Sequence, residues 1–324
     1  MTSPIRVAFA GVFASHLIDR VRARLRIPCE LISGDEREIL GRLADVDVLV
    51  GMGFTREMAE AAPRLRLVQV PGAGLDRIDR GALGSRTALA NAYGHDVGIA
   101  EYVIGAMLAL ARDFGRIDAD LRRGQWDSVW SGTPVPLWRE LAGKTLGILG
   151  YGRIGQAVAK RARAFEMEVL AIRRDVSRPD PHGLAFVRGP EALDEVLGRS
   201  DYVAITLALT ADTRGLIDAR RLGLMKPTAA LINVARGEVV DEDALYQALH
   251  RGGIASAALD VWYRYPSGGA PTHPGHRPFH TLPNVLMTPH VSGWTEGMME
   301  SRASVIAENI HRVVNGEPPE NQVA

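Results

Sequence analysis

Short apolar runs alternate with stretches of helical periodicity in the first part of the chain. Four of these runs have the length and composition of buried strands: Arg6–Phe9, Cys29–Ile32, Val46–Val50 and Leu67–Val70. Helical patterns lie between them, near residues 15–25 and from Asp35 onward. A regular alternation of strand and helix is typical of a parallel, doubly wound sheet.

A second alternating series follows a long apolar helix pattern at Ile99–Leu121. Its expected strands are Thr145–Leu149, Glu168–Ile172, Tyr202–Thr206, Ala229–Asn233, Ile254–Leu259 and Asn284–Met287. A final helix is expected at Glu296–Asn315, and the tail after it could return to the first series. The chain is therefore predicted to be an α/β protein with two Rossmann-like, doubly wound parallel-sheet domains.

A glycine motif joins the first two strands of the second series. Gly150-Tyr151-Gly152-Arg153-Ile154-Gly155 follows the strand directly and opens a helix, which is the context that makes G-x-G-x-x-G a dinucleotide-binding motif. The glycines permit a tight turn, close approach to a pyrophosphate and close packing of helix on strand. The helix N-terminus offers unpaired N–H groups to the phosphates.

The end of the next strand indicates which dinucleotide binds. An NAD site usually has Asp or Glu about 20 residues after the glycines, but here the strand ends in Arg173 and Arg174. A guanidinium binds a 2′-phosphate through charge-assisted hydrogen bonds. The arginines therefore predict NADP(H) as the preferred cofactor, with NAD(H) as the alternative.

Charge and cysteine content exclude several other classes of protein. Lys plus Arg and Asp plus Glu both total 38, so no excess of charge favours nucleic acid or an anionic membrane. The single cysteine, Cys29, forms neither a disulfide nor a metal cluster within the chain, which favours a reducing compartment. The longest apolar stretch, Tyr102–Ala111, is about half the length of a membrane span, and the N-terminus lacks a signal-peptide pattern. We expect a soluble, cytoplasmic protein without a metal.

Seven segments together resemble the D-isomer-specific 2-hydroxyacid dehydrogenase family along essentially the whole chain. They are GAGLDRID (72–79), IAEYVIGAMLALAR (99–112), ELAGKTLGILGYGRIG (140–155), TRGLI (213–217), LINVARGEVVDEDAL (231–245), ALDVW (258–262) and TPHVSG (288–293). The resemblance implies a flavodoxin-like substrate domain of residues 1–96 and 291–324 and a dinucleotide-binding domain of residues 97–290. It also implies an active-site cleft at the hinges and a homodimer built around the helix near 100–120.

The resemblance also assigns roles to individual residues. Arg236 would clamp the substrate carboxylate and carbonyl oxygen, His290 would be the acid/base, and the backbone N–H groups of Ala73 and Gly74 would bind the carboxylate. His95 occupies a position that faces the substrate. The cofactor side would consist of Gly150, Gly152, Arg153, Ile154, Gly155, Arg173, Arg174, Ala208, Thr213, Val234, Ala235, Asp260, His290 and Gly293.

These residue types suit the reduction of a 2-oxo acid to a D-2-hydroxy acid. The reaction needs a hydride donor, a proton for the developing alkoxide and a fixed positive charge for the carboxylate. An arginine fork binds a carboxylate through two parallel bonds, and the ordinary pKa of histidine lies near neutrality. The expected activity is an NAD(P)-dependent oxidoreductase of the CH–OH group that acts on small acids of the glyoxylate, hydroxypyruvate or phenylpyruvate size.

Two residues depart from the family pattern. Tyr265 stands where relatives carry a glutamate that partners the histidine, and Val261–Pro289 contains no Asp or Glu. A tyrosine hydroxyl orients an imidazole but supplies no charge. This departure keeps two alternatives open. The first is a dehydrogenase of another small anion, like the relatives that oxidise formate or phosphite. The second is a non-catalytic protein that senses the cofactor. Glu166 replaces the glycine expected in a left-handed helix C-cap.

Overall fold

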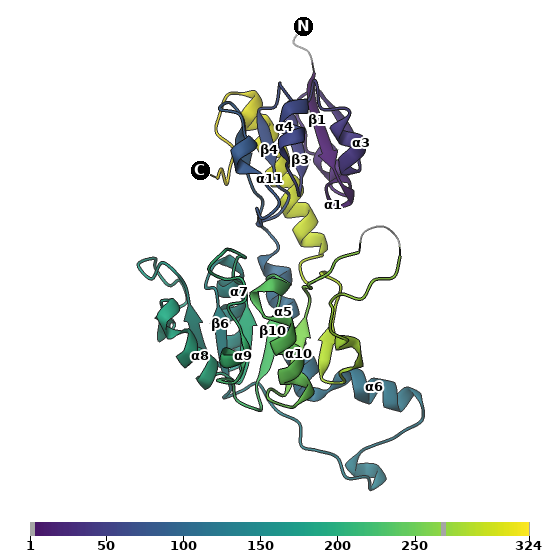
Figure 1. The fold of residues 1–324 in the computed structure, drawn as a ribbon, viewed down its shortest axis with the longest axis vertical. Helices are drawn as coiled ribbons and strands as arrows, with labels where there is room; N and C mark the ends of the chain where they lie inside the picture. The colour runs from purple at the N-terminus through teal and green to yellow at the C-terminus, as the bar shows by residue number, and fades with distance from the viewer. Residues whose placement is uncertain (1–3, 267–269, 324) are drawn as a thin grey trace. The chain divides into compact units, whose positions relative to one another are not determined.

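The computed structural model describes residues 4–266 and 270–323, which divide into two compact units (Figure 1). Unit 1 comprises residues 1–95 and 294–324, and unit 2 comprises residues 96–293. Every strand pair in both sheets is parallel. The predicted fold class, two parallel-sheet α/β domains, is confirmed.

Unit 1 contains a five-stranded sheet in the order β2-β1-β3-β4-β5. Its elements are β1 (Ile5–Ala10), α1 (Val12–Ser15), α2 (Ile18–Arg22), β2 (Cys29–Gly34), α3 (Glu36–Leu40), β3 (Val48–Gly51), α4 (Arg56–Ala61), β4 (Leu67–Gln69), the 3₁₀ turn η1 (Arg80–Ala82), β5 (Ala88–Ala90) and α11 (Glu296–Val314). Successive strand residues point to opposite faces. Val7 and Phe9 therefore pack in the cluster with α1, α2 and α11, whereas Ala8 and Ala10 pack with α3 and α4.

Unit 2 contains a seven-stranded sheet in the order β12-β11-β10-β9-β6-β7-β8. Its strands are β6 (Thr145–Leu149), β7 (Glu168–Ile172), β8 (Phe186–Arg188), β9 (Tyr202–Ile205), β10 (Ala230–Asn233), β11 (Ser256–Leu259) and β12 (Val285–Met287). Its helices are α5 (Asp96–Arg112), α6 (Phe114–Arg122), α7 (Arg153–Ala164), α8 (Leu193–Arg199), α9 (Ala219–Leu222) and α10 (Glu242–His250). The 3₁₀ turns are η2 (Val129–Ser131), η3 (Pro190–Ala192), η4 (Gly237–Val239) and η5 (Phe279–Thr281).

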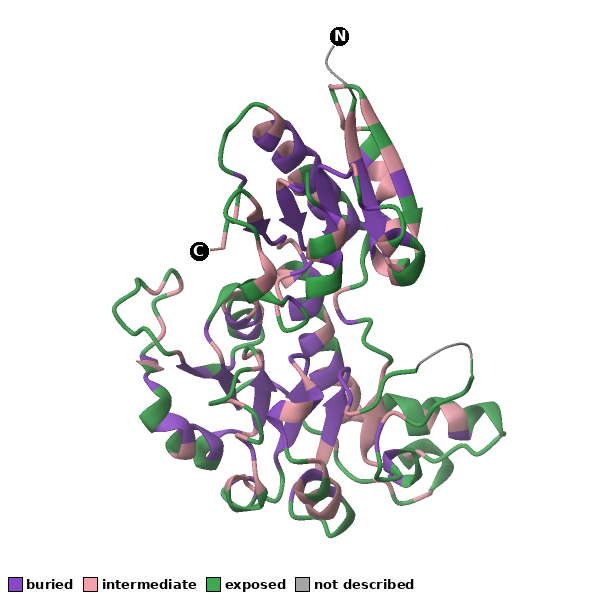
Figure 2. Ribbon diagram, turned by 45° about the horizontal axis from the view of Figure 1, so that its top comes forward, coloured by how far each residue is buried: buried purple, intermediate pink, exposed green. Residues whose placement is uncertain are grey.

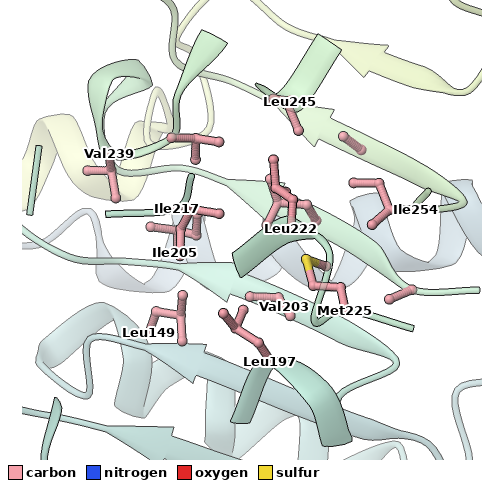
Figure 3. Close-up of a cluster of buried hydrophobic side chains, with 14 of the residues drawn as sticks. Leu149, Leu197, Val203, Ile205, Ile217, Leu222, Met225, Val239, Leu245 and Ile254 are labelled. Atoms are coloured by element: carbon pink, nitrogen blue, oxygen red, sulfur yellow. The ribbon is translucent and has the colours of Figure 1, made fainter. Parts of the chain in front are cut away.

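Two apolar clusters cover the two faces of the unit 2 sheet. Leu149, Val203 and Ile205 pack with Leu197 of α8, Leu222 of α9 and Leu245 of α10 (Figure 3). The alternating positions, such as Ile148 and Ala204, pack with α5 and α7 on the other face. The central strands are buried on both faces (Figure 2), as their nearly continuous apolar composition predicts.

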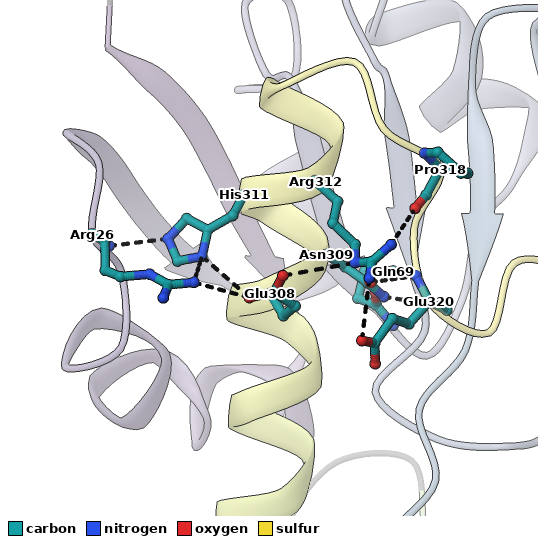
Figure 4. Close-up of polar contacts among 8 residues, drawn as sticks. All are labelled: Arg26, Gln69, Glu308, Asn309, His311, Arg312, Pro318 and Glu320. Carbon is teal, nitrogen blue, oxygen red and sulfur yellow. Dashed lines mark hydrogen bonds and ion pairs between the residues drawn. The ribbon is translucent and has the colours of Figure 1, made fainter.

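The C-terminal tail returns to the sheet of unit 1. Val323 N donates to Leu89 O at 2.8 Å, and Gln322 forms an antiparallel bridge with Ala90. The fully buried Asn309 of α11 anchors this return, because it donates to Gln69 of β4 and accepts from the Glu320 backbone N–H (Figure 4). The predicted return of the tail to the first series is confirmed.

Several predicted elements were wrong in their bounds. The single helix expected at Ile99–Leu121 is two helices, because Asp113 adopts a left-handed conformation with φ 52° that ends α5. Aspartate tolerates this region better than most residues. The helix expected near residues 15–25 is likewise divided into α1 and α2. The short strands β5 and β8 were missed, because three residues are too few for a periodic signal.

No helix among residues 4–266 and 270–323 has the length and apolar character required to cross a bilayer. Within the same residues, no cluster of three or more His, Cys, Asp or Glu side chains could hold a metal ion.

Glu166 adopts the left-handed conformation that glycine was expected to fill, with φ 58°, directly after α7. A residue with a Cβ is strained there by about 1 kcal/mol. Replacement Glu166→Gly should therefore raise the free energy of unfolding by about 1 kcal/mol, measured by urea denaturation. Glu166→Ala is the control, because it removes the carboxylate but keeps the Cβ, and an equal gain from Ala would contradict the strain argument.

Candidate active site

The glycine motif forms a tight turn between β6 and α7. Gly150 has φ 106°, and a Cβ there would lie 2.9 Å from the backbone of Thr206 and Leu207. A Cβ on Gly155 would lie 2.3 Å from Gly150 O, so the close approach of helix to strand requires glycine. Gly152 instead faces open space at the start of α7. That space, in front of a helix N-terminus, suits the pyrophosphate of a dinucleotide.

Arg173 follows β7 at the same edge of the sheet. Leu149 and Ile172 are paired in register, and Tyr151 N donates to Ile172 O at 2.9 Å. The guanidinium of Arg173 lies over the Tyr151 ring at 5.7 Å and donates to the backbone carbonyls of Pro179 and Arg178. The neighbouring Arg174 is exposed.

The remaining residues expected on the cofactor side follow β9 and β10, whose ends lie at the same edge as the glycine turn. Ala208 is exposed, and its carbonyl accepts a hydrogen bond from Thr213 Oγ1 at 2.7 Å. Val234 and Ala235 are buried. Arg153 is exposed and Ile154 half-buried in the first turn of α7, and Gly293 ends unit 2.

Arg236 stands in the turn after β10. The buried Asn233 shapes this turn: its Oδ1 accepts from Ala235 N, and its Nδ2 donates to Arg236 O, both at 3.0 Å. The half-buried Arg236 side chain donates to Ala235 O at 2.8 Å. Its positive charge also acts on the Tyr265 phenol, so these two side chains lie in one electrostatic environment.

His290 and Tyr265 form a hydrogen-bonded pair. Tyr265 Oη lies 2.8 Å from His290 Nδ1, and Trp262 N donates to the same hydroxyl at 3.4 Å. Partial burial raises the pKa of the Tyr265 phenol above its ordinary value, so the phenol stays neutral at physiological pH. A hydroxyl donates to a neutral imidazole and accepts from an imidazolium. The pair thus orients the ring in either state without supplying negative charge.

The segment that carries His290 is held by a buried carboxylate. Asp260 is fully buried, and its oxygens accept hydrogen bonds from Thr288 Oγ1, Val291 N and Ser292 N at 2.6, 2.9 and 2.8 Å. Between these anchors His290 takes a left-handed φ of 59°. Strained backbone of this kind persists where its surroundings impose it, often at functional sites.

Sequence reasoning missed three residues that hold the segment before His290 in place, namely Thr288, Tyr102 and Trp262. Thr288 Oγ1 also contacts Tyr102 Oη at 2.7 Å, and Trp262 Nε1 donates to Thr288 O at 2.8 Å. Burial, followed by the Asp260 charge, raises the pKa of Tyr102 to about 12 despite its bond to Thr288. Tyr102 and Trp262 lie within the motif segments, but residue spacing does not indicate that they converge on Thr288.

The other predicted substrate residues belong to unit 1. Ala73 and Gly74 follow β4, and Asn91 Nδ2 donates to Ala73 O at 3.1 Å, which fixes that loop. His95 is buried at the end of the unit, with 8% of its surface exposed. Their contacts with substrate stay predictions.

Comparison with known proteins decides the family. The model for the D-isomer specific 2-hydroxyacid dehydrogenase NAD-binding domain matches residues 104–292. A glyoxylate reductase of Pyrococcus furiosus is 38% identical over an alignment of 307 residues, and the match covers 88% of this chain and 86% of that protein. The chain belongs to the D-isomer-specific 2-hydroxyacid dehydrogenase family. This dehydrogenase interconverts 2-oxo and 2-hydroxy acids with a nicotinamide dinucleotide.

Other relatives share this similarity. A D-3-phosphoglycerate dehydrogenase of Methanocaldococcus jannaschii is 38% identical over 297 residues, which cover 89% of this chain but 53% of that protein. A solved structure of an NADPH-dependent glyoxylate/hydroxypyruvate reductase from Sinorhizobium meliloti, in complex with NADP and malonate, matches this chain with a TM-score of 0.82 and 27% identity. That match covers 99% of this chain and 97% of the solved one.

The Tyr265–His290 pair predicts an unusual pH dependence of 2-oxo acid reduction. A carboxylate in place of the phenol would stabilise the imidazolium, so the acid form would persist to higher pH. Tyr265→Glu should therefore raise the pH above which kcat falls. Tyr265→Phe should lower kcat about tenfold without raising that pH. The measurement is kcat against pH at saturating cofactor and substrate. If both variants shift that pH equally, the shift does not come from the negative charge of the glutamate, and the prediction is wrong.

Proposed function

We propose that this dehydrogenase is an NADPH-preferring reductase of small 2-oxo acids, in which Arg236 binds the substrate and His290 supplies the proton. The observation that carries the proposal is the hydrogen-bonded His290–Tyr265 pair in the same electrostatic environment as Arg236. The names of the glyoxylate reductases among its relatives support a small substrate.

The chain's own residues account for substrate binding and proton supply. When bound, the nicotinamide cofactor supplies the hydride. The Arg236 fork holds the carboxylate and stabilises negative charge on the carbonyl oxygen. His290 gives its proton to that oxygen, while Tyr265 keeps the ring oriented. The backbone N–H groups of Ala73 and Gly74 complete the carboxylate site in this proposal.

A preference for NADPH is supported by Arg173 and Arg174. Gly152 leaves room for the pyrophosphate, and Arg173 follows the strand paired with the one before the glycine turn. The guanidinium is held by loop carbonyls and the Tyr151 ring, which are neutral partners that a 2′-phosphate would replace with a stronger, charge-assisted bond.

A homodimer is supported by an exposed apolar segment of unit 2. Figure 1 shows α6 and the chain after it extending away from the unit 2 sheet. The exposed fractions are 64% for Trp126, 92% for Trp130 and 98% for Leu137. Contiguous apolar surface of this kind marks an association site. We propose a second copy of this chain as the occupant, in line with the dimer that the family resemblance implies.

A cytoplasmic location is also part of the proposal. The only cysteine, Cys29, has no partner for a disulfide within the chain. Burial, followed by the nearby Asp47, raises the pKa of its thiol and disfavours the reactive thiolate. A chain with this cysteine content suits a reducing compartment.

Removal of the Arg236 fork should abolish most activity. Arg236→Ala should lower kcat/KM for glyoxylate by about 100-fold or more, because it removes transition-state stabilisation as well as binding. Cofactor affinity, measured by fluorescence titration, should stay near that of the wild type. The exposed Arg251, at the end of α10, provides the control Arg251→Ala. Near-normal turnover by Arg236→Ala would show that another group binds the carboxylate.

Neutralisation of Arg173 should weaken the cofactor preference. Arg173→Gln should reduce the ratio of kcat/KM for NADPH to that for NADH by about tenfold, which corresponds to one charge-assisted contact. Arg178→Gln is a matched control, since this exposed arginine of the same loop pairs with Asp175. A wild type that uses NADH equally well would overturn the preference.

The dimer is tested by the mass of the protein in solution. Light scattering after size-exclusion chromatography should give twice the chain mass of 35.1 kDa. The double variant Trp130→Asp, Leu137→Asp should give a monomer, because charge is excluded from an apolar interface. Val176→Asp, at an exposed apolar residue outside this segment, should stay dimeric. A monomeric wild type would contradict the proposal.

A further inference from the structure

Arg302 is a buried arginine whose environment lacks an acidic partner. It lies on the inner face of α11, with 7% of its surface exposed. Its Nε is fully buried, and no hydrogen bond or ion pair connects the side chain to any residue within 4–266 or 270–323. Its one contact of note is with the face of the Phe13 ring, 5.1 Å from the guanidinium carbon.

Two acidic side chains on elements of unit 1, Glu300 and Glu36, are already paired with other arginines. Glu300, two residues earlier on α11, pairs with Arg20 and Arg24. Glu36, whose side chain lies beside Gly11, pairs with Arg77 at 2.9 Å. Burial alone lowers the pKa of the Arg302 guanidinium, to about 10, so the group remains charged at neutral pH. A buried charge without a counterion is costly, and this cost is offset when an anion binds.

The place of Arg302 in unit 1 suits a ligand site. Phe13 belongs to α1, which follows the carboxyl end of β1. Strand order reverses between β1 and β3, and open α/β sheets bind ligands at the carboxyl edge beside such a switch point. A Cβ on Gly94, which follows β5, would lie 2.2 Å from Ser301 Oγ. Arg302 therefore lies at the sheet edge that also bears Ala73 and Gly74.

The Phe13 ring that lies against the guanidinium belongs to an aromatic cluster of unit 1. Trp294 packs edge-on against Phe13 and His16, with ring centroids 5.4 and 5.6 Å apart.

We propose that Arg302 is a specificity residue that binds a second anionic group of the substrate, so that the enzyme favours 2-oxo acids with a distal carboxylate or phosphate. The inference rests on the proposed function and deepens it. The guanidinium fork matches either anion through two parallel hydrogen bonds. The Phe13 ring and the burial of Arg302 keep water away from the pair, which strengthens it.

The test compares substrates of equal chain length in wild type, Arg302→Met and Arg302→Lys. We expect the wild type to favour oxaloacetate over 2-oxobutyrate, or hydroxypyruvate phosphate over hydroxypyruvate, by about tenfold or more in kcat/KM. The pair with the larger ratio identifies carboxylate or phosphate as the distal group. Arg302→Met should lose that preference, Arg302→Lys should keep part of it, and glyoxylate should be reduced equally by all three.

Arg20→Met removes the same charge from a partly exposed arginine of unit 1 that pairs with Glu300, and it should leave the ratios unchanged. Methionine fits an apolar site of this volume, so Arg302→Met should unfold at or above the temperature of the wild type. Ratios that do not change in Arg302→Met, or a wild type without preference for either dianion, would overturn the inference.

A binding measurement separates this inference from the proposed function. Succinate should raise the unfolding temperature of the cofactor-free wild type more than butyrate does, and this difference should vanish in Arg302→Met. That result supports the anion site even if no 2-oxo acid is reduced, in which case the proposed function alone fails. Equal effects of succinate and butyrate on the wild type would overturn the anion site.

Discussion

The buried carboxylate of Asp260 is the constraint on which the conformation of the His290 segment depends. A buried charge is tolerated only where hydrogen bonds replace its hydration. Here three donors, Thr288 Oγ1 and the N–H groups of Val291 and Ser292, all come from the segment that carries His290. Their spacing around one carboxylate imposes the left-handed conformation of His290. The backbone conformation of His290, the proposed acid/base, is therefore tied to the hydrogen bonds that satisfy Asp260.

Tyr265 stands where the family resemblance implies a glutamate, and this difference concerns the electrostatics of the site more than its shape. The phenol reaches His290 Nδ1 at 2.8 Å, so the ring is still oriented. Because the phenol is neutral, it adds no negative charge to the environment that it shares with Arg236. Compared with a site that carries a carboxylate here, such a site attracts an anion more strongly but stabilises an imidazolium less. In the proposed function, a tyrosine at this position therefore favours binding of the acid over retention of the proton on His290.

Arg173 and Arg302 differ in how far their surroundings compensate the charge of the guanidinium, and this difference decides how strongly each would favour a bound anion. Both have an Nε that is buried without a hydrogen bond and a guanidinium that lies over an aromatic ring. Arg173 also donates to two backbone carbonyls, so its charge is partly solvated by the chain. Arg302 makes no such hydrogen bond with any of the described residues. The second environment is the more costly one for a cation, and binding of an anion would relieve it.

The sequence by itself determined the fold class, the glycine turn and the family. Strand length and apolar composition follow from burial on both faces of a parallel sheet, and β6 and β7 were predicted with the bounds observed. Arg236, His290 and Tyr265 were named because their motifs are local. The tertiary structure decided the rest. Only folding brings Tyr102, Thr288 and Asp260 together, turns the chain at Asp113 and encloses Arg302, because contacts between distant segments leave no periodic signal in the sequence.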